Sequence, residues 1–481
     1  MTNPALFPPA TQPLVEELAT VPDVMTAVTA VADQPGVLLL ESALHREPLG
    51  RYSLLTADPF AWFEIPQAEF GTDPFAAIRD RLAQFATKTV PDLPPFQGGA
   101  AGLLGYELGR TWESWPRSGC DEFRFPDMAV GLYDWVLAWD HAAEKAWIIS
   151  HGFPETDEGG RRNRAVRRAG FVRDRLQTAL SGGLENPSSK NQSRRVQIGV
   201  PQWPAPGPER LTSDFSRDGY LQAVDRTIAY IQAGDIFQAN LSQRLLAPLR
   251  ESPLELYRRL RECNPAPFAG YFQHDDWAVV SASPERFLSV RDRLVTTRPI
   301  KGTRQRRAGP EADLFTRDEL RESIKDRAEN VMIVDLMRND LSRVCTPDSI
   351  DVPQLCTVET YETVQHLVSE VCGTLRSGGD AWNLLSAVFP GGSITGAPKV
   401  RAMEIISELE PTVRGPYCGN LFYNGFDGRF DSSILIRTFL CRHGWIQCPV
   451  GGGIVAQSDP ADEYDETLHK AAGMLRALSP R

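Results

Sequence analysis

Short apolar runs separated by turn residues fill the chain from about Thr20 to Ile149, and they restrict its fold more than any other feature. Three of them read VLLLES, AWFEI and VGLYDWVLAW, with proline, glycine and aspartate between them. Runs of this length, rich in β-branched and aromatic residues, favour strands over helices. We therefore predict a first half that is mainly sheet-forming, with a few helices between the strands.

A polar stretch divides this part from the second half. Residues 181–208, SGGLENPSSKNQSRRVQIGVPQWPAPGP, are rich in serine, asparagine, glycine and proline, as is typical of a surface connection. We predict an N-terminal region over 1–190, a linker over 191–210 and a C-terminal region over 211–481. Beyond the linker, apolar residues recur at helical spacing through SDFSRDGYLQAVDRTIAYIQAGD, which predicts a capped helix.

Composition excludes several classes of protein. The chain has 481 residues, enough for two or three ordinary domains or one large two-lobed domain. Its net charge of −11 argues against a nucleic-acid partner, because phosphate binding needs a basic surface. No apolar run is long enough to span a membrane, and MTNPALFPPATQP lacks the pattern of a signal peptide, so we expect no membrane partner and a cytoplasmic location. The eight cysteines include no C-x-x-C pair and are expected to be reduced core thiols.

A basic segment, TRPIKGTRQR, holds Lys301 near its centre. A lysine amine becomes a nucleophile when burial or neighbouring cations disfavour its ammonium form. Arg298, Arg304 and Arg306 are placed to supply such a cationic field. The alternative is a solvated basic loop that binds any anion.

Eight motifs follow one another through the C-terminal region. They read SASPERF, RPIKGTR, AENVMIVDLMRNDLSRV, VQHLVSEV, PGGSITGAPKVRAMEII, SSILIRT, GGGIV and DEYDETLHK. In these motifs the chain resembles the chorismate-utilizing enzymes, a family that contains anthranilate synthase component I, aminodeoxychorismate synthase component I, isochorismate synthase and salicylate synthase. The resemblance implies an α+β protein with an anthranilate synthase component I-like two-lobed fold, in which helices flank large antiparallel β-sheets.

Two positions distinguish the branches of this family. Aminodeoxychorismate synthases look like PIKGTR and anthranilate synthases like PIAGTR, and this chain has Lys301. Isochorismate and salicylate synthases look like KVVLSR where this chain has Gln238, and glutamine cannot activate water as a general base. The resemblance thus implies amination of chorismate at C4, giving 4-amino-4-deoxychorismate for 4-aminobenzoate and folate biosynthesis.

The resemblance assigns three catalytic positions. Lys301 would attack C2 of chorismate, and Glu285 would protonate the departing C4 hydroxyl, which requires a carboxyl pKa raised toward neutrality. Without the family, Glu285 is an ordinary turn glutamate. His366 would face the substrate ring, although a histidine among apolar residues is more often a satisfied core residue.

Further motifs point to anion binding. PGGSITGAPK lacks the GK[ST] of a Walker A loop, and instead predicts a turn followed by a helix near Pro398, with Ser393 or Thr395 facing an anion. A triple glycine is usually a turn, but its family position implies a carboxylate cradle. Arg437 would bind a carboxylate in forked geometry, with a structural salt bridge as the alternative. The substrate-binding positions implied are Gln238, Thr303, Ser393, Tyr417, Arg437, Gly451, Gly452, Gly453 and Lys470.

Two predicted helices carry candidate metal ligands. The first, near residues 326–337, places Asp326 and Glu329 one turn apart on one face. The second is expected to begin after Ser458 as N-cap, with Pro460 in its first turn.

The second helix places Glu463, Glu466 and Lys470 on one face. Alone, Glu466 and Lys470 form an ordinary exposed pair. The resemblance implies that Glu329 and Glu466 hold Mg²⁺, with Asp326 and Glu463 as supporting or water-mediated ligands. Magnesium prefers oxygen ligands and is often bound jointly with an anion, here the ring carboxylate of chorismate.

The chain shows no convincing glutaminase motif. The resemblance therefore implies a separate glutamine amidotransferase subunit that supplies ammonia, and an aminodeoxychorismate lyase that acts on the product. Two alternatives stay open. An anthranilate synthase component I is favoured by the N-terminal LLES segment but disfavoured by Lys301, and a catalytically silent amino-acid-binding regulatory subunit is disfavoured by the intact set of site residues.

Three segments, LLLES, GRYSLL and NPAPFAGYF, resemble those that hold tryptophan in anthranilate synthases. This resemblance implies a possible tryptophan pocket at Ser42, Tyr52, Pro265 and Phe268. Ordinary packing of these residues is the alternative.

Overall fold

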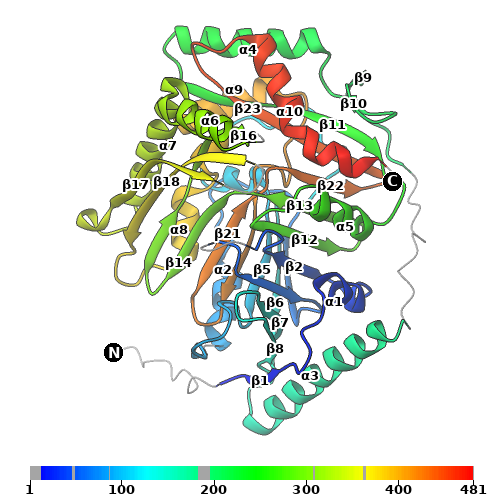
Figure 1. Cartoon of the computed structure of the whole chain (residues 1–481). Coiled ribbons are helices and arrows are strands. Elements are labelled where there is room, and N and C mark those ends of the chain that lie inside the picture. The colour runs from blue at the N-terminus through cyan, green and yellow to red at the C-terminus, as the bar shows by residue number, and fades with distance from the viewer. Residues whose placement is uncertain are drawn as a thin grey trace.

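Two large antiparallel sheets form the framework of the chain (Figure 1). The computed structural model describes residues 12–45, 49–85, 87–182, 195–306, 309–360 and 364–479. Neighbouring named strands pair in antiparallel fashion throughout both sheets. Together with the flanking helices, this arrangement confirms the predicted α+β class.

The larger sheet has 13 strands within the described residues. In spatial order they are β1 (Leu14–Glu17), β8 (Lys145–Ser150), β7 (Trp135–Asp140), β3 (Tyr52–Thr56), β2 (Val37–Glu41), β12 (Phe268–His274), β13 (Trp277–Ser283), β22 (Thr438–Arg442), β23 (Trp445–Ile454), β11 (Gln238–Pro248), β10 (Thr212–Ser213) and β9 (Trp203–Pro204), with β19 (Gly396–Ala397) also paired to β11.

The second sheet has 10 strands within the described residues. In spatial order they are β16 (Ile300–Gln305), β18 (Val364–Thr374), β15 (Leu294–Thr297), β14 (Arg286–Arg291), β21 (Phe430–Ile434), β20 (Asn420–Gly425), β5 (Gly99–Leu104), β6 (Met128–Tyr133) and β4 (Ala61–Ile65), with β17 (Asp351–Thr360) also paired to β18.

Helices cover the outer faces of the sheets. They are α1 (Val24–Val31), α2 (Ala76–Leu82), α3 (Glu158–Leu180), α4 (Arg217–Gln232), α5 (Pro253–Cys263), α6 (Pro310–Glu322), α7 (Ile324–Ser342), α8 (Ala381–Val388), α9 (Lys399–Leu409) and α10 (Pro460–Leu478). α10 packs on β23 beside α4 and α5, while α7 packs on β18 and β16. Among the described helices, none has both the length and the apolar character needed to cross a membrane.

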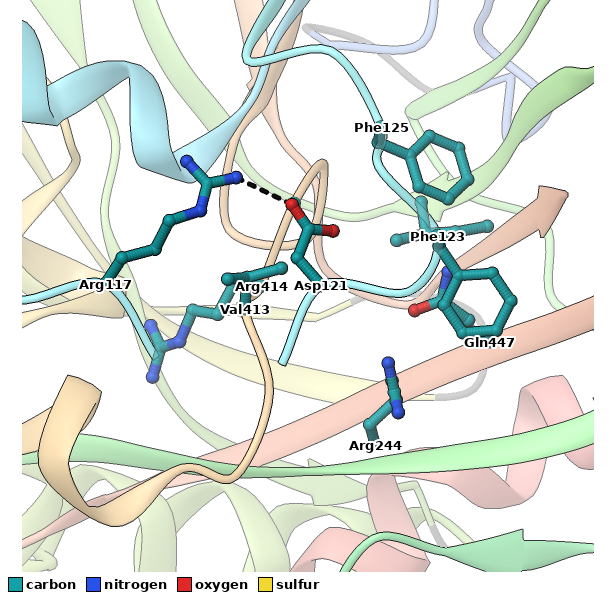
Figure 2. Close-up of a pocket in the computed structure, with 10 residues that line it drawn as sticks. Arg117, Asp121, Phe123, Phe125, Arg244, Val413, Arg414 and Gln447 are labelled. Atoms are coloured by element: carbon teal, nitrogen blue, oxygen red, sulfur yellow. Dashed lines mark hydrogen bonds and ion pairs between the residues drawn. The ribbon is translucent and has the colours of Figure 1, made fainter. Parts of the chain in front are cut away.

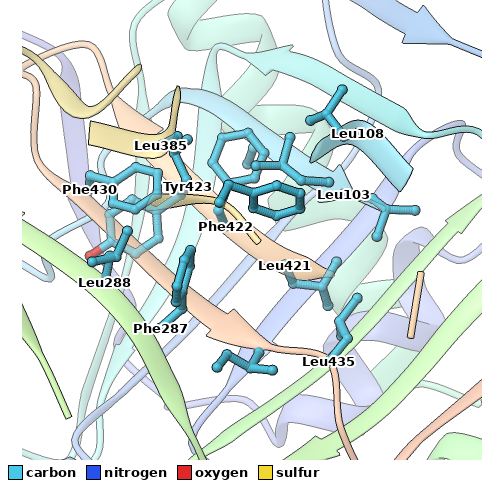
Figure 3. Close-up of a cluster of buried hydrophobic side chains, with 14 of the residues drawn as sticks. Leu103, Leu108, Phe287, Leu288, Leu385, Leu421, Phe422, Tyr423, Phe430 and Leu435 are labelled. Atoms are coloured by element: carbon cyan, nitrogen blue, oxygen red, sulfur yellow. The ribbon is translucent and has the colours of Figure 1, made fainter. Parts of the chain in front are cut away.

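Both sheets combine strands from the two sides of the predicted linker. In the larger sheet β2 pairs with β12, and in the second sheet β5 pairs with β20. The core between the sheets is equally mixed, since Leu103 of β5 packs in one cluster with Leu288 of β14 and Phe422 of β20 (Figure 3). Of the predicted linker, residues 195–210 are described and include β9, whereas 191–194 lie outside the described residues.

The predicted strand-rich pattern of the first half is present, but one apolar run serves both sheets. VGLYDWVLAW contributes to β6 of the second sheet and to β7 of the larger one. The chain passes between them at Asp134, which is fully buried and paired with Arg164 and Arg168 of α3. A buried carboxylate needs such partners, so α3 stabilises this crossing.

Two helices predicted from local signals are present. α4 begins after Ser216, whose hydroxyl accepts a hydrogen bond from the Gly219 N–H, and α9 begins after Pro398 as predicted. The predicted cap of α10 was wrong by one residue. Asp459 caps this helix, because its carboxylate reaches the N–H groups of Ala461 and Asp462, whereas Ser458 donates its hydroxyl to Glu463 (2.6 Å).

Candidate active site

The predicted catalytic residues come from two strands of the second sheet and from a connection between the two sheets. Lys301 lies on β16, His366 on the neighbouring β18, and Glu285 in the connection between β13 and β14. The Lys301 amine donates a hydrogen bond to the backbone carbonyl of Ser393 (2.9 Å), in the short turn over Gly392–Ile394. Pairing of β16 with β18 places Lys301 opposite Leu367 and Thr303 opposite His366.

The pKa of the Lys301 amine depends mainly on its removal from water. Burial lowers the pKa of Lys301 below its ordinary value, against the opposing influence of the Glu329 and Glu285 carboxyls. The predicted cationic field of the three flanking arginines was wrong, because each of them is paired with carboxylates. Their ion pairs are Arg298 with Glu359 and Glu370, Arg304 with Glu319 and Asp326, and Arg306 with Asp313.

Glu285 is a buried carboxyl beside this amine. Burial raises the pKa of Glu285 to about 7, although Lys301, the Ser393 side chain and Arg437 favour the charged form. A carboxyl with this pKa holds a proton in a substantial fraction of molecules near neutral pH and can donate it. This matches the raised pKa that the general-acid role requires.

His366 is buried and neutral. Its Nδ1 lies 2.9 Å from the Thr303 hydroxyl, and burial, with a contribution from Arg437, lowers the pKa of His366 to about 3. The residue is therefore at once a hydrogen-bonded interior histidine and a neighbour of Arg437 and Thr303. A neutral imidazole here can orient a substrate ring without adding charge.

Arg437 is a cation without a fixed anionic partner. Within the described part of the chain it forms no ion pair, so the structural salt bridge considered as an alternative is not present. Burial lowers the pKa of Arg437, and Glu285 is the carboxyl that opposes this shift. A half-buried guanidinium of this kind is suited to a substrate carboxylate.

Two glutamates on facing helices form the acidic side of the site. Burial raises the pKa of Glu329 on α7, and its carboxylate neighbours Asp326 and Glu466 raise it further, while Lys301 and Lys325 lower it. On α10, burial raises the pKa of Glu466, but the nearby lysines outweigh this effect and hold the pKa below its ordinary value. The nearest is Lys470, whose amine lies 2.6 Å from the Glu466 carboxylate.

The two supporting acids predicted for the metal are paired with cations. Asp326 accepts a hydrogen bond from Arg304 (3.0 Å), and Glu463 accepts one from Lys325 (3.1 Å). Across the described ranges, no group of three or more acidic, histidine or cysteine side chains has the arrangement of a complete metal site. Glu466 is paired as well, with Lys470 (2.6 Å), and both Asp326 and Glu466 raise the pKa of Glu329.

The triple glycine lies within a strand, not a turn. Gly451, Gly452 and Gly453 on β23 pair with Ser242, Leu241 and Asn240 of β11, respectively, while the pairing of β23 with β22 ends at Gln447. This stretch is therefore paired along one edge only, among the described strands. A Cβ at Gly452 would approach Glu463, Lys470 and Glu466 (3.2 to 3.7 Å), so this glycine faces the acidic side of the site.

Gln238 begins β11 against this glycine strand. A Cβ at Gly453 would lie 2.2 Å from the Gln238 amide nitrogen, so the end of the Gln238 side chain would have to move. The Gln238 side chain is buried, and its amide oxygen has no hydrogen-bond partner among the described residues. Lys470 donates to the Gly451 carbonyl (3.1 Å), which fixes the amine at the same strand.

Tyr417 is linked to the site through an arginine that the sequence analysis missed. The guanidinium of Arg414 lies 6.0 Å from the Tyr417 ring and donates to the carbonyl of Ile394, next to Ser393. Nothing in the local sequence RGPYCG distinguishes a buried arginine from an exposed one.

The residues of the predicted tryptophan pocket meet at one end of β2 and β12. The Ser42 hydroxyl donates to the carbonyl of Pro267 (3.3 Å), next to Phe268 and two residues from Pro265. Tyr52 opens β3, the other neighbour of β2. The Arg286 guanidinium covers the Phe268 ring at 5.1 Å.

Comparison with known proteins shows the family of this chain. The family model for chorismate binding enzymes matches residues 41–476. Aminodeoxychorismate synthase component 1 of Klebsiella aerogenes is 39% identical over 465 residues, covering 93% of this chain and 95% of that protein. Anthranilate synthase component 1 of Thermus thermophilus is 38% identical over 469 residues, covering 96% of each.

Solved structures show the same fold. Anthranilate synthase component I from Streptococcus pneumoniae TIGR4 superposes with a TM-score of 0.74 at 29% identity, covering 90% of this chain and 94% of that one. The menaquinone-specific isochorismate synthase from Escherichia coli superposes with a TM-score of 0.69 at 17% identity, covering 97% and 95%. On its sequence match and its fold, this chain belongs to the chorismate binding enzyme family.

Proposed function

We propose that this enzyme aminates chorismate at C4 and produces 4-amino-4-deoxychorismate. The observation that carries the proposal is the half-buried Lys301, whose amine donates to the Ser393 carbonyl, beside the raised-pKa carboxyl of Glu285. The similarity to aminodeoxychorismate synthase component 1 over 93% of the chain supports it. Gln238 cannot serve as a base for water, which disfavours the isochorismate reaction.

In the proposed reaction, the neutral Lys301 amine forms a bond to C2 of chorismate. The two conjugated ring double bonds shift, the C4–O bond breaks, and the Glu285 proton leaves with the hydroxyl as water. Ammonia then bonds to C4, both double bonds shift back, the C2–N bond breaks to restore the Lys301 amine, and the new ammonium returns a proton to Glu285. The sum is chorismate and ammonia converted to 4-amino-4-deoxychorismate and water.

The remaining groups bind and orient the substrate. Arg437 offers a cation to one carboxylate, and the one-sided pairing of Gly451–Gly453 supports a second carboxylate cradle. Neutral His366 lies against the ring. Lys301 lies on β16 and Glu285 in the two-residue connection between β13 and β14, so paired strands hold both positions.

The residues of the acidic side fit a magnesium ion. Glu329 and Glu466 are oxygen donors whose like charges raise the pKa of Glu329, and a divalent cation would relieve this repulsion. We propose that these two carboxylates hold Mg²⁺, with Asp326 and Glu463 acting through water. When bound, the ion supplies positive charge for a carboxylate of chorismate.

We further propose a cytoplasmic heterodimer with a glutamine amidotransferase that supplies ammonia, and an aminodeoxychorismate lyase downstream that directs the product to 4-aminobenzoate and folate. The relatives named component 1 support a partner subunit. All eight cysteines are free thiols, as a reducing compartment favours.

For Ser42, Tyr52, Pro265 and Phe268 we propose a tryptophan pocket. Calorimetric titration of the protein with tryptophan tests this proposal, and no heat of binding to the ligand-free protein would exclude an open pocket.

Product identification tests the main proposal. Purified protein is supplied with chorismate, magnesium and an ammonium salt, with and without aminodeoxychorismate lyase, and products are separated by chromatography and weighed by mass spectrometry. We expect 4-aminobenzoate only when lyase is present. Anthranilate formed without lyase would instead identify the chain as an anthranilate synthase component. The similarity to the Thermus thermophilus protein supports this alternative.

Lys301→Ala tests the covalent step in the same assay. We expect nearly complete loss of product with chorismate binding retained, because the variant lacks the nucleophile but keeps the carboxylate-binding groups. Lys145→Ala is a matched control, since Lys145 is exposed and paired with Glu17 far from the site. Wild-type rates for Lys301→Ala would remove the nucleophile assignment.

A further inference from the structure

A buried arginine–glutamate pair contacts the turn over residues 391–395, which carries the Ser393 carbonyl that binds Lys301. Arg414 and Glu410 join through two hydrogen bonds, from Arg414 Nε (2.9 Å) and Nη2 (2.6 Å). Their side chains are only 2% and 4% exposed. Glu410 also accepts from the N–H and hydroxyl of Ser242 on β11 (2.9 and 2.8 Å). Figure 2 shows Arg414 at the edge of a pocket that it shares with Arg244.

The guanidinium of Arg414 connects two segments that carry site residues. Its Nη1 donates to the Ile394 carbonyl (2.8 Å), and its Nη2 to the Asn240 carbonyl (2.5 Å). Asn240 in turn donates its N–H to the Thr395 carbonyl (2.7 Å). Arg414 therefore closes a ring of hydrogen bonds between β11 and the turn over residues 391–395.

Both segments carry residues of the proposed active site. The turn carries Ser393, whose carbonyl accepts the hydrogen bond from the Lys301 amine, and β11 carries Gln238 two residues before Asn240. A lysine in place of Arg414 has one nitrogen and cannot bind the carboxylate and two carbonyls in the same planar geometry. The contacts to Ile394 and Asn240 thus depend on a guanidinium.

We infer that Arg414 is a positioning residue of the active site, which fixes the Ser393 carbonyl against Lys301 by tying the turn to β11. The expected fall in kcat rests on the proposed function. The hydrogen bonds from Arg414 to the turn and to β11 are present in the protein without substrate. Misplacing a reacting group by about 1 Å can cost roughly a hundredfold in rate, so loss of the tie should lower kcat.

Arg414→Lys tests the inference with two readouts. In hydrogen–deuterium exchange of the ligand-free protein, we expect faster exchange of peptides that cover residues 391–396. In steady-state kinetics we expect kcat to fall about ten- to a hundredfold, with little change in KM for chorismate. Wild-type exchange in the turn together with wild-type kcat would overturn the inference.

Arg244→Lys is the matched control. Arg244 also lies on β11 and pairs with a buried carboxylate, Glu122 (2.8 Å), with side chains 5% and 6% exposed. Within the described residues its hydrogen bonds go to Asp214 and Glu122, not to the turn. We expect this variant to lose stability without faster exchange at 391–396. Equal acceleration there in Arg244→Lys would show a general loosening and overturn the inference.

A second variant covers the case in which Arg414→Lys does not fold. Glu410→Gln keeps the side-chain size but removes the charge that holds the guanidinium, so we expect a smaller acceleration of exchange in the same peptides; unchanged exchange would contradict the tie. Because exchange needs no chorismate, it still decides the inference if product analysis of the wild-type protein yields anthranilate.

Discussion

At the scale of single residues, Glu285 and Lys301 illustrate how burial prepares two ordinary side chains for chemistry. Removal from water disfavours both charged forms, raising the pKa of the acid to about 7 and lowering the pKa of the amine. Each shift moves the group toward the protonation state that the proposed reaction needs. The opposing attraction between the two charges keeps both shifts limited.

The pH dependence of the reaction should report Glu285. The proton that it donates is lost as pH rises through about 7, so kcat/KM for chorismate should fall on the alkaline side, while the amine of Lys301 gains its neutral form in the same direction. Glu285→Gln should lower kcat by about 10²- to 10⁴-fold and remove the alkaline limb. Rates measured from about pH 6 to about pH 9 at constant free ammonia test this, and an unchanged alkaline limb in the variant would exclude Glu285 as the acid.

The magnesium requirement should depend on Glu329 and Glu466. Glu329→Gln or Glu466→Gln removes a charged oxygen ligand, and we expect the half-saturating magnesium concentration to rise roughly ten- to a hundredfold. Magnesium titrations followed by activity and by calorimetry provide the measurement. Asp462→Asn, an exposed change in the first turn of α10, is the control, and equal magnesium affinity in all variants would reject this ligand pair.

At the scale of elements, strand β23 and helix α10 build one wall of the site together. The glycines allow close approach, because the space that side chains would fill on β23 is taken by Gln238 from β11 and by Glu463, Glu466 and Lys470 from α10. Close packing of strand and helix places the acidic face of α10 beside the carboxylate cradle proposed for β23.

Gly453→Ala tests this packing. The added Cβ would fall 2.2 Å from the Gln238 amide nitrogen, so the side chain must move and KM for chorismate should rise about tenfold or more, with a stability loss of about 1 to 3 kcal/mol. Gly170→Ala in α3 is the control. It meets open space, and we expect about 1 kcal/mol of added stability with unchanged KM. An unchanged KM in a folded Gly453→Ala protein would show that Gln238 does not bind substrate.

At the scale of the whole molecule, each sheet is assembled from both ends of the sequence. β2 lies between β3 and β12, and β5 lies between β6 and β20, so the N-terminal region forms one end of each sheet. The core between the sheets is shared as well. The catalytic strands therefore depend on segments that precede them by hundreds of positions, although the proposed catalytic, substrate-binding and metal-binding residues lie beyond residue 211.

Separate expression of the two regions tests this dependence. We expect residues 1–190 and 195–481 to be insoluble or non-native alone, because β12 and β20 would expose unpaired edges, and to assemble when co-expressed. Circular dichroism, copurification and turnover provide the measurements, with the intact chain as reference. A C-terminal fragment that folds and converts chorismate by itself would establish an independent catalytic domain.

Much of this protein follows from its sequence alone. Strand-forming runs predict a sheet-forming first half, and local signals predict a helix after the linker and another near Pro398, because these signals act over a few neighbouring residues. The ordered motifs identify the site residues by resemblance, and the structure places Lys301, Glu285 and His366 on adjoining strands and turns.

Tertiary structure decided what depends on distant partners. The sequence does not show that VGLYDWVLAW serves two sheets, that the arginines around Lys301 are neutralised by carboxylates, or that Arg414 ties the catalytic turn to β11. Burial and ion pairing join residues far apart in the chain, and they set the pKa of each site group. The sequence thus determined which residues are available for chemistry, whereas the fold decided their charge states, because desolvation exists only in the packed molecule.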